Sequence, residues 1–108
     1  HFYKGKPIFY SLGNFTFGTM GRADPDTGIF QLRYRLTEDG PVLENFTVIP
    51  CRTRGSGDYR PYELTEEKDR QKMLKKLVFQ RKAKGMQNLP ESFITTGSVD
   101  FVNGEMIP

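Results

Sequence analysis

The chain has 108 residues and a mass of 12.4 kDa, which is the size of one domain and excludes a tandem multidomain protein. Sixteen Lys and Arg against thirteen Asp and Glu leave a charge of +3, and nine Phe with five Tyr supply the apolar bulk that a disordered chain lacks. One Cys excludes an internal disulfide, and together with a single His it provides too few ligands for an ordinary zinc site. No apolar run reaches the roughly 20 residues that span a bilayer. The strand-like start at His1, without a signal peptide, suggests a piece of a longer chain.

The opening residues 1–17 are rich in aromatic side chains. A turn at Lys4-Gly5-Lys6-Pro7 precedes an apolar run without alternation, which is typical of a strand buried on both faces. We therefore expect a strand over 7–12. Residues 18–28 have no periodicity and several Gly, so they predict a loop.

Residues 29–53 predict an antiparallel hairpin. Phe30, Leu32, Tyr34 and Leu36 alternate with polar residues, as in a half-buried strand, and Glu38-Asp39-Gly40 has the composition of a turn. The returning arm has apolar residues on both parities, and it contains Pro50, which cannot donate a backbone hydrogen bond. We therefore expect an edge position or a bulge near Pro50.

A helix is expected over about 65–84, capped by Thr65 and stopped by Gly85. Its apolar stripe should pack on the sheet. The opposite side gathers lysines around Phe79, and residues 66–84 hold eight basic and three acidic side chains, or +5, which leaves −2 for the remainder. The basic residues of this face are Lys68, Lys72, Lys75, Lys76 and Lys82, and the face is either a solvated outer surface or an anion-binding site.

The tail, residues 86–108, predicts a short hairpin around Asn103-Gly104. The expected fold class is thus α+β: a small antiparallel sheet, made of hairpin 29–53 and strand 7–12, with one long amphipathic helix. The expected organisation has three parts: 1–17 as the terminal strand segment of an upstream catalytic domain, 18–85 as an α+β region, and 86–108 as a tail.

Common catalytic and binding motifs do not fit. Gly13 and Gly18 have the gap of a phosphate-binding loop, but Thr19-Met20 follows where Lys and Ser or Thr are required. The stretch 24–28 resembles a calcium loop only in part, since its Gly is one place early and Arg35 occupies the twelfth position. Cys51, next to Pro50 in a strand, is expected to be a buried structural thiol.

The run YSLGNF, within the longer stretch from Tyr3 to Phe15, resembles a segment near the end of the catalytic domain in the CapA family of bacterial capsule-synthesis proteins. That family is linked to poly-γ-glutamate and is related to calcineurin-like metallophosphoesterases. A weaker likeness continues through Val48-Ile49-Pro50 and Arg60-Pro61-Tyr62, so that it covers about two-thirds of the chain.

The resemblance implies that divalent metal ions are held by motifs upstream of His1, and it gives no metal-ligand role to a residue of this chain. It places Ser11, Gly13, Asn14 and Phe15 near the rim of the active-site cleft, with Asn14 best suited to a polar contact. Alternatively, Gly13 and Asn14 form a tight turn at the exit of a strand. The implied location is the bacterial cell surface or another extracytoplasmic site.

Two functions are therefore expected. In the first, the chain completes or covers the cleft of a metallophosphoesterase-like domain of the same protein and is inactive alone. In the second, the basic helix face binds an anionic polymer or acidic lipid headgroups, without binding nucleic acid. The isolated chain is also expected to self-associate, because residues 1–17 have the pattern of an interior strand.

Overall fold

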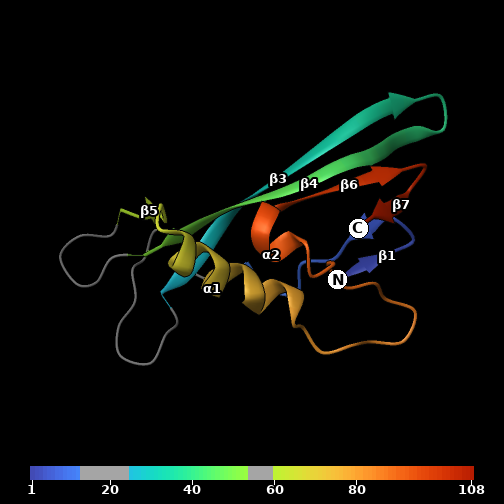
Figure 1. Ribbon diagram of the computed structural model, residues 1–108. Helices are drawn as coiled ribbons and strands as arrows, with labels where there is room; N and C mark the ends of the chain where they lie inside the picture. Colours follow the sequence, from blue (N-terminus) through green and yellow to red (C-terminus); the bar gives the residue numbers. More distant parts are fainter. Residues whose placement is uncertain (13–24, 54–59) are drawn as a thin grey trace.

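The computed structural model describes residues 1–12, 25–53 and 60–108. Its main element is a five-stranded antiparallel sheet, in which β3 (Asp26–Thr37), β4 (Gly40–Arg52), β6 (Ser98–Val102) and β7 (Glu105–Ile107) follow one another in space. The two-residue strand β5 (Tyr62–Glu63) pairs with the end of β4. Figure 1 shows β3 and β4 as a long hairpin that projects past the rest of the molecule.

The β3–β4 hairpin confirms the predicted pairing, but its irregularity lies elsewhere than expected. Arg33 pairs with Asn45 whereas Tyr34 pairs with Leu43, so Glu44 is the extra residue of a bulge. Pro50 pairs in register with Gly28. The bulge changes which parity of β4 faces the core, and this explains why Leu43 before it and Phe46 after it are both buried.

Two short helices accompany the sheet: α1 (Glu67–Val78) and α2 (Phe93–Thr96). The apolar stripe of α1 is buried as predicted, at Met73, Leu74 and Val78. The helix is shorter than the predicted range 65–84, and its N-cap is Glu66 instead of Thr65. The described part of the chain is therefore mostly β, and the expectation of an α+β fold with one long helix is wrong.

The early end of α1 has a local cause. The backbone of Phe79 is no longer helical. The side-chain amide of Gln80 donates to the carbonyl oxygen of Lys76, which in a longer helix would accept from the backbone amide of residue 80. Residues 79–84 also contribute no buried side chain, so packing does not stabilise a further turn.

The N-terminal segment does not form the predicted strand 7–12. A small hairpin forms instead, from β1 (Phe2–Tyr3) and β2 (Lys6–Pro7), and residues 8–12 pair with no strand of the described chain. Tyr10 and Leu12 are 68% and 72% exposed. A strand buried on both faces needs neighbours on each side, and the described residues do not supply them.

One aromatic core joins the beginning, middle and end of the chain. The ring of Phe46 on β4 lies 5.4 Å from that of Phe2 and 5.8 Å from that of Phe93, and Phe2 also contacts Phe101 on β6. Phe93 is fully buried. The predicted tail hairpin around Asn103-Gly104 is confirmed as β6 and β7, and β6 adds to the edge of β4.

Candidate functional site

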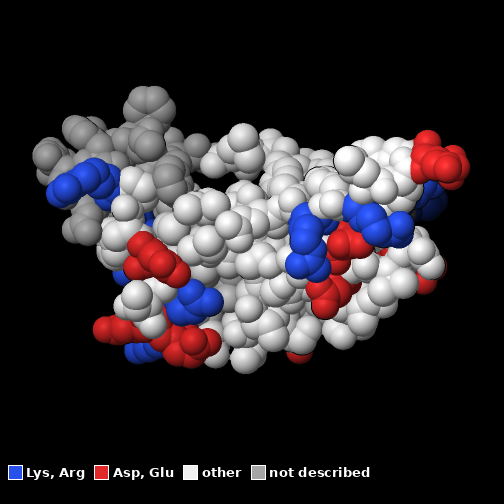
Figure 2. All heavy atoms as spheres, turned by 90° about the horizontal axis from the view of Figure 1, so that it is seen from above, with Lys and Arg blue, Asp and Glu red and all other residues white. Residues whose placement is uncertain are grey.

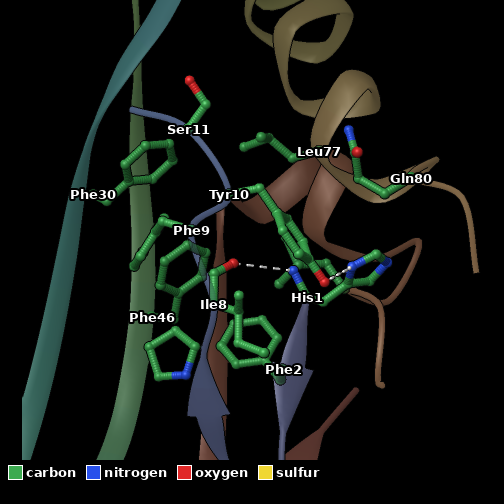
Figure 3. A pocket seen from close by; sticks show the side chains of 12 residues that line it. His1, Phe2, Ile8, Phe9, Tyr10, Ser11, Phe30, Phe46, Leu77 and Gln80 are labelled. Atoms are coloured by element: carbon green, nitrogen blue, oxygen red, sulfur yellow. Dashed lines mark hydrogen bonds between the residues drawn. The ribbon is translucent and has the colours of Figure 1, made fainter. Parts of the chain in front are cut away.

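A cavity of about 280 Å³ lies between residues 7–11, the sheet and the end of α1 (Figure 3). Its walls are largely aromatic and aliphatic, which suits an apolar group. The lining residues are His1, Phe2, Pro7, Ile8, Phe9, Tyr10, Ser11, Phe30, Phe46, Leu77, Gln80 and Leu89.

A hydrogen-bonded chain centred on the imidazole of His1 positions one wall of this cavity. Nε2–H of His1 donates to the carbonyl oxygen of Arg81 over 2.7 Å, so in the neutral ring Nδ1 accepts from the hydroxyl of Tyr10 over 2.8 Å. The rings of His1 and Tyr10 meet edge to face, with centroids 5.4 Å apart. These contacts tie the segment 8–12 to the residues that follow α1.

Residue Ser11, which the resemblance places at a cleft rim, does line the cavity. In Figure 3 it lies at one end of the cavity, beyond Phe30 and Phe9, with its hydroxyl turned away from the ring cluster. The other three residues with that role, Gly13, Asn14 and Phe15, lie outside the described residues. Ser11 is therefore the last residue of the opening segment that lines the cavity, and the next side chain, Leu12, is exposed.

Fewer lysines share the basic face of α1 than the sequence predicts. Lys68, Lys72 and Lys75 are exposed on α1, but Lys82 lies beyond the end of the helix. Nζ of Lys76 lies 2.6 Å from a carboxylate oxygen of Asp26, a side chain that is only 4% exposed. Lys76 thus belongs to an ion pair that joins α1 to β3.

The same carboxylate of Asp26 also accepts from Nε of Arg52 over 3.1 Å. This hydrogen bond is the main cause that raises the pKa of Arg52 above its usual value, so the guanidinium of Arg52 stays charged at any ordinary pH. No motif in the sequence points to the pairing of Asp26 with Arg52. The hairpin register, which sets them opposite each other, is the signal that could have found them.

Cys51 is confirmed as a buried free thiol. Burial raises its pKa, and the charge of Glu63 acts in the same direction. Because the thiolate is the reactive form, the Cys51 side chain is unreactive near neutral pH.

No group of three or more His, Cys, Asp or Glu side chains that could hold a metal ion occurs within residues 1–12, 25–53 and 60–108. The described part of the chain likewise contains no helix long and apolar enough to cross a membrane. Comparisons with family models, with curated proteins and with solved structures find no match for this chain.

Proposed function

We propose that this chain is a C-terminal module of a CapA-like capsule-synthesis protein and that it completes or covers the cleft of an upstream metallophosphoesterase-like domain. The observation that supports this proposal is the exposed apolar segment 8–12, where Tyr10 and Leu12 are 68% and 72% exposed beside the cavity. Neighbouring apolar side chains left in water are typical of a surface that another protein body covers. In the proposed arrangement Ser11 lies at the rim of the joint cleft.

Footprinting with hydroxyl radicals tests this contact. Tyr10 and Leu12 should be oxidised readily in the 108-residue chain, and they should be protected when the chain is part of a longer protein that carries the upstream domain. Ile107, half exposed on β7, is the internal control and should react similarly in both. Equal oxidation of Tyr10 in the two proteins would contradict the proposal.

A phosphatase assay tests the non-catalytic role. The isolated chain should give no turnover of p-nitrophenyl phosphate above the blank with Mg²⁺, Mn²⁺ or Zn²⁺, because the proposal assigns the metal ligands to the upstream domain. Turnover that EDTA abolishes would refute this part of the proposal.

A second candidate function is the binding of an anionic polymer by α1. Lys68, Lys72 and Lys75 follow one another at spacings of four and three residues, so they share one exposed stripe of the helix. No ion pair is formed by these three side chains with the described residues. An uncompensated row of positive charge attracts polyanions in a salt-dependent manner.

Paired charge reversals test this second candidate. The double variant Lys72→Glu/Lys75→Glu should abolish salt-sensitive binding to polyglutamate. The control Lys82→Glu/Lys84→Glu changes the net charge by the same amount outside the helix and should still bind. An equal loss of binding in both double variants would show that only net charge matters. Unchanged binding of Lys72→Glu/Lys75→Glu would exclude anion binding by α1.

A further inference from the structure

The outer edge of β3 is open along a strand of twelve residues. β3 pairs with β4 on one side, and no strand within the described residues pairs with its other side. Proteins usually protect such an edge with a proline, a lysine, a bulge or a short strand. β3 contains neither proline nor lysine, and the bulge of the hairpin lies in β4 at Glu44.

The two charged side chains in the middle of β3 are turned toward the neighbouring strand. Nε of Arg35 lies 3.1 Å from one carboxylate oxygen of Glu44, and Nε of Arg33 lies 3.6 Å from the other. Figure 2 shows basic and acidic groups side by side toward the hairpin end of the molecule, and a largely uncharged surface in the middle. Each of these arginines therefore has a counter-charge within its own hairpin, and it opposes an approaching strand only where another cation lies directly opposite.

The far half of β3 also exposes apolar side chains. By alternation, Tyr34 and Leu36 lie on the face that carries Phe30 and Leu32 toward the core, yet they are 45% and 85% exposed. α1 covers this face only near the start of the strand, where the methyl carbon of Met73 lies against Gly28.

From these features we infer that two copies of the chain associate by antiparallel pairing of their β3 edges, with Leu32 on the two-fold axis. This inference does not depend on the proposed function. We assign a second copy of the chain as the partner for three reasons. One register of β3 paired with itself sets no arginine opposite another, keeps the helices of the two copies apart, and covers the exposed apolar side chains.

In this register, residues whose numbers add up to 64 are opposite each other. Arg33 of one copy faces Gln31 of the other, and Arg35 faces Ile29, so no arginine faces an arginine. Registers centred on residues 33, 34 or 35 oppose like charges, which destabilises a strand pair.

The same register covers the exposed apolar side chains. Tyr34 of each copy lies opposite Phe30 of the other, which forms an aromatic cross-strand pair. Leu36 lies opposite Gly28, next to Met73 of the second copy. Since the helices lie near the first halves of the two strands, they occupy opposite ends of the dimer and do not collide. The register centred on Gln31 fits less well, because it sets Leu36 opposite the carboxylate of Asp26.

Charge substitution at Gln31 tests the register. Gln31 is exposed, so its replacement leaves the fold intact. Gln31→Arg sets an arginine opposite Arg33 of the other copy on each side of the two-fold axis. This variant should raise the dimer dissociation constant, measured by sedimentation equilibrium, about tenfold, whereas Gln31→Glu should lower it. Glu91→Gln adds the same charge as Gln31→Arg at an exposed site in the turn just before α2, and it should have no effect. A strictly monomeric chain at high concentration, or a dimer that ignores Gln31→Arg, would overturn the inference.

Disulfide trapping provides an independent test. An equimolar mixture of Gln31→Cys and Arg33→Cys chains should form a cross-linked heterodimer under mild oxidation, because these positions are directly opposite. Either variant alone should cross-link much more slowly, since its two cysteines are diagonal and too far apart for an unstrained disulfide. Buried Cys51 does not compete. Equal rates for the mixture and the single variants would exclude this register.

Discussion

Residue Gly5 permits the close approach of two turns. Its φ is +72°, and a Cβ at this position would lie 2.5 Å from the carbonyl oxygen of Gly104. Gly104 also has a positive φ, of +80°, but a Cβ there would meet nothing within 4 Å. Gly5→Ala should therefore destabilise the fold by about 3 kcal/mol, from strain and clash together, whereas Gly104→Ala should cost only the strain of about 1 kcal/mol. Urea unfolding measures both, and equal losses would contradict this geometry.

Asp26 joins three elements through its nearly buried carboxylate. Asp26→Asn keeps the shape but removes the nearly buried carboxylate that pairs with Lys76 and Arg52, so we expect a loss of about 2 kcal/mol in the free energy of unfolding. Glu44→Gln is the control, because Glu44 is more exposed and its ion pairs should contribute less than about 1 kcal/mol. An equal effect of the two substitutions in thermal or urea unfolding would show that burial of Asp26 is unimportant.

At the scale of elements, the end of α1 after Val78 gives a direct test. Lys72→Gly, in the exposed interior of the helix, should cost about 1 kcal/mol of stability. Ala83→Gly should have no measurable effect, because residue 83 lies beyond the helix. If Ala83→Gly destabilised the protein as much as Lys72→Gly, the helix would extend through residue 83 in solution.

The elements that the sequence predicted are those with a local signal. Alternation at Phe30 and Leu32 and the dipeptide Asn103-Gly104 define hairpins without reference to the rest of the chain. The length of the helix was overestimated because residues 79–84 favour helix by composition, whereas the packing that stabilises a helix ends at Val78. The run 8–12 has the pattern of a buried strand, because an apolar segment looks alike in the sequence whether its side chains are buried or exposed.

The candidate site was predictable only in part, for a similar reason. The resemblance drew attention to Ser11, which does line the cavity. The imidazole of His1, the carbonyl group of Arg81 and the Asp26 cluster depend on contacts between residues far apart in the sequence, and no spacing in the chain encodes them.

At the scale of the whole molecule, Phe2 connects the two ends of the chain. It is 3% exposed, packs on Phe46 and Phe101, and exchanges two backbone hydrogen bonds with Gln87. Phe2→Ala should cost about 3 kcal/mol and should speed hydrogen exchange in β6 and β7 as well as in β1. Tyr3→Ala, at an exposed neighbouring position, is the control. If β6 and β7 exchanged at the wild-type rate in the Phe2→Ala protein, the ends would be independent of each other.

The buried thiol of Cys51 is a natural probe for opening of the sheet. An alkylating reagent can reach this sulfur only when β4 separates from the neighbouring strands, so the rate of labelling depends on how often the sheet opens. The labelled fraction, measured by mass spectrometry after a fixed reaction time, would then report how often the sheet opens and under which conditions it stays unfolded.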